Sequence, residues 1–325
     1  MGGEVSVDIT SVPLGELSEG WGRRSARSVL RIVVSSFGLL FTAFLFCFLL
    51  FSVLPSDPAR VMLGPNASQD SVESLREELG LNDSLVKQLT RQMGQLVTLD
   101  FGRSIRDGRP VLPEVFEKFG VTIGIGIQAT TIALLVSYLI NLIVFLRPKF
   151  GWLIGLVGFG VVAPAFLLAM AGALLIGYFF PGISLTASAE GFFAPLVPSA
   201  IASLYPIALM TRILRKQVEE CQASSFFRAA IAVGHSKESQ FHRFALQPSL
   251  VPWLAAWINQ LSLIFFATLV LELIFSISGS GVLLVNAIQD RDFPILQGVL
   301  LVNAVFFIGI STISEIVFAR IDPRL

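Results

Sequence analysis

Charged side chains are scarce in this sequence. Asp, Glu, Lys and Arg make up 14% of the 325 residues, whereas a soluble domain carries roughly 25%. Hydrophobic residues make up 54%, and the mean hydropathy is +0.76. The formal net charge is zero, so no basic field indicates a nucleic-acid partner. This composition excludes an ordinary soluble protein and predicts an integral protein of a lipid bilayer.

Cysteine and histidine are also scarce, with two of each. Cys47 and Cys221 are too few for a disulfide framework, and we expect two unpaired thiols. A catalytic zinc site needs three protein ligands, and His235 and His242 are the only histidines. The sequence therefore predicts no metal site.

The motifs of nucleotide-binding and hydrolytic enzymes are missing. No Gly-x-x-x-x-Gly-Lys-Ser/Thr pattern occurs, so we do not expect the chain to bind ATP itself. No Gly-x-Ser-x-Gly pattern and no His-rich motif supports an enzyme embedded in the membrane. The chain is therefore predicted not to be an enzyme and to hold no cofactor of its own.

Long charge-free runs are what the sequence does have. A helix needs about 20 apolar residues to cross a bilayer, and an isolated strand cannot cross because its backbone groups would stay unpaired. The runs predict an all-α membrane protein with six spans, at residues 29–54, 121–146, 151–180, 193–212, 249–276 and 296–318. Pro164 lies inside the third span and is expected to kink it.

Basic residues predict the orientation, because Arg and Lys gather on the cytoplasmic side of a membrane. Arg23, Arg24, Arg27 and Arg31 lie before the charge-free run of the first span, and more basic residues follow spans two, four and six, so both termini are predicted to be cytoplasmic. The expected parts are a disordered cytoplasmic tail (1–28), the first span (29–54), an extracytoplasmic helical region (55–120), a five-helix core (121–318) and a cytoplasmic tail (319–325).

Two helices are expected inside the extracytoplasmic region. The first, in SQDSVESLREELGL, has Ser68 or Ser71 as a cap and Gly80 near its end. The second follows in DSLVKQLTRQMGQLV, whose apolar residues recur at helical spacing. The next stretch, LDFGRSIRDGRPV, is typical of extended chain with a turn at Asp107-Gly108.

A polar insert, 213–248, separates spans four and five and holds both histidines. Its residues Phe226, Phe227, Ala230, Ile231 and Gly234 recur every three to four positions, which predicts a short helix with one apolar face. Gly234 offers a stop for that helix, and a second helix is expected to begin near Ser239. Such a helix either lies on the bilayer surface as a connector or binds in a groove of another protein.

A few polar residues lie inside the predicted spans. Glu272 is the one acid in the fifth apolar stretch, and its expected role is either a substrate or gate contact or a structural pairing. Asn259 and Gln128 are further candidates for the pathway, although hydrogen bonds between helices are the more frequent use of such amides.

Several motifs, in order along the chain, resemble those of the first permease subunit in the dipeptide, oligopeptide and nickel family of ABC importers. The first span ends in LPSDPAR, similar to a Leu-Pro-Gly-Asp-Pro ending with Ser56 in place of the glycine. LREELGL and LDFGRS follow at the family's separation, and FFRAAIAVG resembles the family's Arg-Thr-Ala-Arg-Ala-Lys-Gly loop. LELIFSISGSG, DFPILQG and the final IDPRL are similar to Glu-x-x-Phe-x-x-x-Gly-x-Gly, Asp-(Tyr/Phe)-Pro-x-x-Gln-Gly and Asp-Pro-Arg.

The resemblance implies a type I importer permease in the cytoplasmic membrane. It implies a second homologous permease, two cytoplasmic ATPases that bind ATP and Mg²⁺, and an extracytoplasmic solute-binding protein that meets region 55–120. The insert would then be the helix that couples the permease to an ATPase. Its expected contact residues are Phe226, Phe227, Arg228, Ala229, Ala230, Gly234, His235 and Ser236.

The motif departs from the family at two positions that bear on the ATPase. His235 stands where leucine is typical, and Val233 stands where lysine is common. Peptides are the cargo that the resemblance favours, with nickel, glutathione or another small solute as alternatives. A self-contained secondary transporter is a further alternative, but such proteins usually show inverted repeats, and none is visible.

Overall fold

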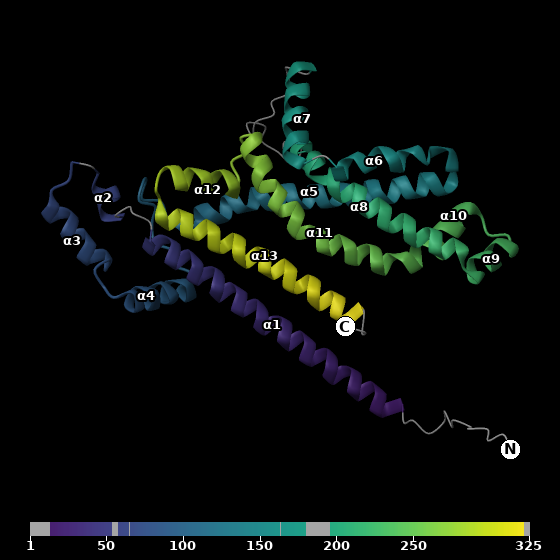
Figure 1. The fold of residues 1–325 in the computed structure, drawn as a ribbon, viewed down its shortest axis with the longest axis horizontal. Coiled ribbons are helices and arrows are strands. Elements are labelled where there is room, and N and C mark those ends of the chain that lie inside the picture. The colour runs from purple at the N-terminus through teal and green to yellow at the C-terminus, as the bar shows by residue number, and fades with distance from the viewer. Residues whose placement is uncertain (1–13, 54–57, 65, 163, 180–195, 322–325) are drawn as a thin grey trace.

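The computed structural model describes residues 14–53, 58–64, 66–162, 164–179 and 196–321. Every regular element in these residues is a helix, and the extended chain contributes one isolated bridge, between Arg103 and Pro110. The prediction of an all-α protein is confirmed. The long helices run along the length of the molecule, as Figure 1 shows.

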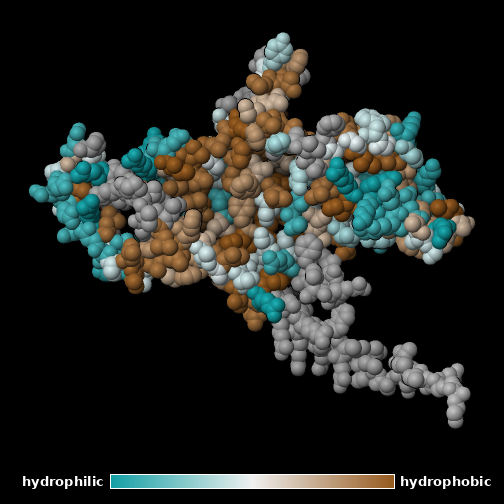
Figure 2. Space-filling model, viewed as in Figure 1, coloured by the Kyte–Doolittle hydropathy of each residue, from teal (hydrophilic) through white to brown (hydrophobic). Residues whose placement is uncertain are grey.

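Five helical stretches in the described residues are long and apolar enough to cross a membrane. They are Leu30–Leu49 within α1, Val111–Leu146 (α5), Leu196–Ala223 (α8), Lys237–Ile274 (ending in α11) and Phe293–Val317 within α13. Apolar residues cover the middle of the molecule in Figure 2, and polar residues gather at its two ends. One end carries α2, α3 and α4, which lie within residues 58–98, and α12 (Ser280–Gln289). The other end carries α9 (Ser225–Ala232) and α10 (Lys237–Ser239), as Figure 1 shows. We name them the α12 end and the α9 end.

The third predicted span, 151–180, differs from the expectation of one continuous helix. The chain forms α6 (Trp152–Val162) and α7 (Ala165–Phe179), with Pro164 between them, so the structure has a break where a kink was predicted. Proline lacks a backbone N–H and clashes with the preceding turn, which explains the break. Helix α7 runs across the direction of α5 and α8 (Figure 1) and is shorter than the about 20 residues of a span.

Helix boundaries extend beyond the predicted spans at several places. Helix α1 runs over Leu14–Val53, so half of the predicted disordered tail is helical, and residues 1–13 lie outside the described part. Helix α5 begins at Val111, ten residues before the predicted span. Helix α13 (Phe293–Ile321) lies beside α1, and a hydrogen bond of 2.6 Å joins the hydroxyls of Ser36 and Thr312.

The region before α5 folds from local signals. Helix α2 covers Pro58–Leu63, α3 covers Gln69–Leu79 and α4 covers Leu85–Thr98. The side chain of Ser68 accepts a hydrogen bond from the Ser71 amide, and Gly80 ends α3 with a φ of 64°. Glycine adopts this left-handed conformation without the strain of a side chain. Both predicted helices are therefore confirmed, with Ser68 as the cap of the first.

The insert 213–248 is almost wholly helical. Helix α8 continues to Ala223, and α9 (Ser225–Ala232) and α10 (Lys237–Ser239) follow. A π-helical stretch, Gln240–Leu246, then leads without a gap into α11 (Gln247–Ile274). The second helix of the insert thus begins two residues before the predicted Ser239 and is continuous with the fifth span.

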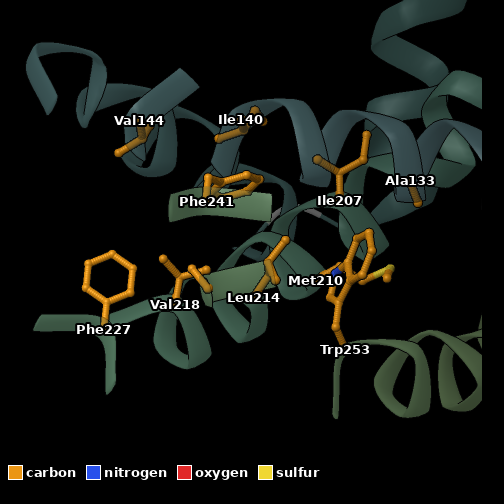
Figure 3. Close-up of a cluster of buried hydrophobic side chains, with 11 residues drawn as sticks. Ala133, Ile140, Val144, Ile207, Met210, Leu214, Val218, Phe227, Phe241 and Trp253 are labelled. Atoms are coloured by element: carbon orange, nitrogen blue, oxygen red, sulfur yellow. The ribbon is translucent and has the colours of Figure 1, made fainter. Parts of the chain in front are cut away.

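The largest hydrophobic cluster joins the insert to the long helices. Figure 3 shows Phe227 of α9 and Phe241 of the π-helical stretch beside residues of α5 and α8, with Trp253 of α11 at the other side. A second cluster joins α5, α7, α8 and α11, and a third joins the start of α5 to α12 (Ser280–Gln289) and α13. The insert is therefore part of the packed core and not a loose connector.

Candidate functional site

Helix α9 is held at both ends by hydrogen bonds that its sequence encodes. The Ser224 hydroxyl accepts from the Phe227 amide at 3.3 Å and caps the start of the helix. At the other end, the amides of Gly234 and His235 donate to the carbonyls of Ile231 and Ala230. Gly234 has a φ of 86°, as this C-terminal motif requires. The predicted stop at Gly234 is confirmed, and a helix of only eight residues has a fixed shape.

The predicted single apolar face of α9 is divided by the fold. Phe227 is 3% exposed and Ala230 is also buried, because both point into the core. Phe226 is 45% exposed, and Ile231 and Val233 are exposed as well. The prediction that both phenylalanines share one face is therefore wrong, because adjacent residues on a helix point about 100° apart. The outward surface consists of Phe226, Arg228, Ala229, Ile231, Ala232, Val233 and Gly234.

The inward residue of α9 lies against two long helices. The Phe227 ring meets Phe145 of α5 edge-on at 6.3 Å, and Phe145 in turn contacts Phe241 at 5.2 Å. Val218 of α8 belongs to the same buried cluster (Figure 3). Since close-packed side chains transmit displacement, a force on α9 acts directly on α5 and α8.

The polar turn after α9 ties the insert to the core. Ser236 caps α10 by accepting from the Ser239 amide, and His235 packs on the Phe244 ring at 4.9 Å. His242 bonds the Tyr138 hydroxyl of α5 at 2.7 Å through Nε2. The two histidines thus have separate partners. No group of three or more His, Cys, Asp or Glu side chains that could hold a metal occurs in the described residues.

The π-helical stretch ends close to a proline. The amide of Gln247 donates to the carbonyl of His242, five residues back. Pro248 follows and has no N–H to donate to the carbonyl four residues before it. π-Helical turns are rare and occur frequently at functional sites. Here the turn lies at the junction between the insert and α11, where sequence reasoning expected only an ordinary helix.

Glu272 lies at the other end of the bundle and is fully buried. Its Oε1 accepts a hydrogen bond from the Thr122 hydroxyl at 2.5 Å, and its Oε2 accepts from the Gly281 amide at 2.7 Å. The Thr122 oxygen accepts from the Ser280 amide at 3.0 Å. A carboxylate is favourable at this place, because the first amides of α12 lack partners within the helix. Of the two expected roles, the geometry fits the structural one.

The glycines after Glu272 are needed for this arrangement. A Cβ at Gly279 would overlap the Glu272 carboxyl group, and one at Gly281 would lie 2.6 Å from the Leu269 carbonyl oxygen. Phe275 is buried in the second cluster. The motif Glu-x-x-Phe-x-x-x-Gly-x-Gly therefore encodes the capping of α12 from a neighbouring helix.

The other two pathway candidates lie in different surroundings. Gln128 is buried, and its Oε1 accepts from the Ser199 hydroxyl of α8 at 3.1 Å. This is the contact between helices that such amides usually make. Asn259 is exposed on the surface of α11 and is the one of the three that another molecule could reach.

A polar clasp at the α12 end was not anticipated as a site. Asp292, 4% exposed, accepts hydrogen bonds from the Ser104 hydroxyl and from the amides of Ile105 and Ile295. Arg106 pairs with Asp290 beside it. The clasp joins the LDFGRS and DFPILQG motifs, and their position in the chain gave no signal that they meet.

The clasp borders a pocket of about 320 Å³ between the loop 104–109 and α12. The hydrogen bonds from Arg109 lower the pKa of Asp107 to about 2. Arg109 also faces Glu114 at 3.4 Å. Arg106 and Arg109 of the pocket lining therefore form ion pairs with Asp290, Asp107 and Glu114 of the same lining.

Comparison with known proteins agrees with this architecture. The family model described as binding-protein-dependent transport system inner membrane component matches residues 150–325, and the model of the N-terminal part of such components matches residues 26–126. A peptide transport system permease protein of Brucella abortus is 30% identical over 309 residues, which cover 91% of this chain and 98% of that protein.

Two further relatives are named for narrower cargo. The dipeptide transport system permease protein DppB of Lactococcus lactis is 29% identical over 296 residues, covering 88% of this chain and 96% of that protein. The glutathione transport system permease protein GsiC of Escherichia coli is 28% identical over 291 residues, covering 88% and 94%. These matches include both the insert and the segment after Glu272. The chain therefore belongs to the family of binding-protein-dependent transport system inner membrane components, and it is a multi-pass inner-membrane permease of an ABC importer with the type I fold.

Proposed function

We propose that this chain is one of two permease subunits in an ATP-driven importer of di- and oligopeptides. The names of its relatives support this cargo, since they specify peptides, dipeptides and glutathione, itself a small peptide. Glutathione, nickel or another small solute is the alternative cargo. Family membership implies ATPase and binding-protein partners in general. In the proposed complex these are a second homologous permease, two ATPases that hold ATP and Mg²⁺, and one solute-binding protein.

The α9 end faces the cytoplasm in this proposal. The start of α1 and the end of α13 both point toward this end (Figure 1). Basic residues outnumber acidic ones in the segments at this end, including Arg212, Arg215, Lys216, Arg228 and Lys237, as expected for a cytoplasmic face. The N- and C-termini are then cytoplasmic, and α2–α4 and the clasp meet the solute-binding protein outside.

The division of α9 into two faces is the observation that carries the proposed coupling. Phe226, Ile231 and Val233 are exposed apolar side chains on α9 and on the turn that follows it, and Arg228 is exposed as well. An exposed aromatic residue next to small residues is typical of a helix that binds in a groove. The buried Phe227 fixes the same helix to α5 and α8. Closure of an ATPase would thus move α9 and, through Phe227, the long helices.

The remaining candidates have different parts in the proposal. Arg228 and Ala229 lie on the exposed side of α9, which would contact the ATPase. His235 and Ser236 fix the turn after α9, and Ala230 packs on the buried side of the helix. Asn259 is the candidate for a pathway contact. Glu272 and Gln128 position the helices that enclose the pathway, through the hydrogen bonds described above. The chain itself is expected not to hydrolyse ATP.

A reconstitution tests the proposal. The chain is isolated from native membranes in mild detergent, and the proteins that accompany it are identified by mass spectrometry. We expect a second permease, ATPases with a P-loop and a solute-binding protein, and ATP-dependent uptake of labelled dipeptides by liposomes that contain all of them. Recovery of the chain alone, with solute flux that needs no ATP, would contradict the proposal and favour a secondary transporter.

A further inference from the structure

Five buried polar atoms have no hydrogen-bond partner in the described part of the chain, and all five lie on α5, α8 or α11. They are Asn141 Oδ1, Thr211 Oγ1, Trp253 Nε1, Trp257 Nε1 and Gln260 Oε1. Asn141, Thr211, Trp253 and Gln260 are each more than nine-tenths buried. An unpaired polar group in an apolar interior costs free energy, and lipid on the far side of the helices offers no partner. We call this set the polar seam.

The members of the polar seam fall into two groups, one along α11 and one between α5 and α8. Trp253, Trp257 and Gln260 recur at helical spacing and form one stripe along α11. The Asn141 amide nitrogen donates to the Thr211 backbone carbonyl at 3.2 Å, so the Asn141 side chain lies against the backbone of Thr211 between α5 and α8. Trp253 belongs to the same buried cluster as Met210 and Leu214 of α8 (Figure 3).

The chemistry of the unpaired atoms selects the ligand. An indole N–H can only donate, and an amide oxygen can only accept. These groups therefore need a molecule that accepts from the indoles and donates to the oxygens, and water is the smallest molecule that does both. Buried waters usually make about three hydrogen bonds to such otherwise unpaired groups. We propose that the polar seam between α5, α8 and α11 is a binding site for internal water molecules.

The position of the polar seam gives the waters a role. Helices α8 and α11 are connected by α9, α10 and the π-helical stretch, so any displacement of α9 changes how these two helices meet. Direct hydrogen bonds between them would have to break during such a shift. Waters can exchange partners, because a water-mediated bond is nearly as favourable as a direct one. This second part of the inference rests on the proposed coupling function, and the presence of water does not.

Radiolytic labelling of the assembled importer in lipid nanodiscs tests for the water directly. X-rays convert bound water to hydroxyl radicals, which oxidise the side chains beside it, and mass spectrometry locates the products. After correction for intrinsic reactivity, we expect Trp253 and Met210 to be oxidised faster than Phe265 and Phe275, which are similarly buried in the same bundle. Equal corrected rates at all four residues would overturn the proposal.

The sign of a stability change gives an independent test. Gln260→Leu removes one unpaired group and nearly preserves volume. In a dry seam this substitution would raise the midpoint of thermal unfolding by about 2 to 4 °C, because it removes an unsatisfied group. In a hydrated seam it lowers the midpoint, because the water loses a partner. Gln95→Leu, at an exposed position of α4, is the matched control and should leave the midpoint unchanged.

The consequence for coupling is measured separately. Peptide-stimulated ATP hydrolysis should fall in Gln260→Leu relative to Gln95→Leu when the seam is hydrated. If the labelling shows water in the polar seam but peptide-stimulated ATP hydrolysis does not change, the waters have no role in coupling. The water site itself would then still stand. The labelling and the thermal midpoint do not depend on which solute is carried, so a failure of the peptide assignment is distinguishable from a failure of the water site.

Discussion

The two ends of the helix bundle are held together in different ways. At the α12 end, buried polar groups of distant segments are paired: Ser104 with Asp292, and Thr122 and the Gly281 amide with Glu272. At the α9 end, the contacts are mainly the apolar packing of Phe227, Phe241 and Val218, with unpaired polar atoms beside it. The same helices α5 and α11 take part in both ends.

The difference indicates which end is fixed and which can shift. A buried hydrogen bond has a strict geometry, and losing it leaves a costly unpaired group. Apolar contacts are non-directional and allow small displacements at little cost. A rigid α12 end would hold the helices together while the α9 end, with its π-helical junction, follows a moving partner. The predictions below test this contrast, from the largest expected loss of stability to the smallest.

Glu272→Ala should have the largest effect, because it leaves the Thr122 hydroxyl and the first amides of α12 without an acceptor. We expect a loss of about 3–5 kcal/mol, with most of the protein lost on extraction from the membrane. Glu272→Gln retains an acceptor oxygen and should recover much of the yield. The measurement is the monodisperse fraction and thermal midpoint of each variant, with Glu315→Ala as an exposed control. A normal midpoint in Glu272→Ala would contradict the capping role.

Phe227→Ala should cost about 3 kcal/mol, since removing a buried phenylalanine leaves a cavity in the largest cluster. The loss should be concentrated at the α9 end. Hydrogen exchange of α9 and of the end of α8 should accelerate, whereas exchange at the start of α12 should not change. Faster exchange at both ends would show that the two ends are not independent.

Asp292→Ala should cost about 2–3 kcal/mol, because three donors lose their acceptor. Ser104→Ala removes one of these donors and should cost less. Exchange should now accelerate in the loop 104–109 and not in α9, the reverse of the pattern for Phe227→Ala. Equal effects of the two substitutions on α9 would argue against a fixed α12 end.

The sequence was sufficient for features that are encoded locally. The cap at Ser68, one of two serines predicted for it, and the stops at Gly80 and Gly234 each depend on one residue and its neighbours in the chain. Pro164 was predicted to distort its span, although the distortion is a break and not a kink. The all-α architecture followed from run length, because a bilayer demands helices. These features need no knowledge of what packs against them.

The sequence was insufficient where the partner is distant or is backbone. Phe226 and Phe227 are both apolar, and only the position of Phe145 on α5 decides which of them is buried. Glu272 suited either a pathway or a structural role because its partner, the Gly281 amide, has no side-chain signature. The pairing of Ser104 with Asp292 spans 188 positions, a separation at which spacing gives no information.

Phe226→Ala should have the smallest effect on stability and the sharpest effect on function. Its side chain is 45% exposed, so we expect the free energy of unfolding to change by no more than about 0.5 kcal/mol. If α9 binds an ATPase groove, however, the aromatic anchor is lost, and copurification of the ATPases and peptide-stimulated ATP hydrolysis should both fall. Phe226→Tyr, which preserves the ring, should restore most of the activity.

Phe227→Ala and Phe226→Ala then separate the two faces of one helix: the first weakens the fold, and the second weakens only the contact with the ATPase. Full coupling in Phe226→Ala would mean that the exposed face of α9 is not the contact surface.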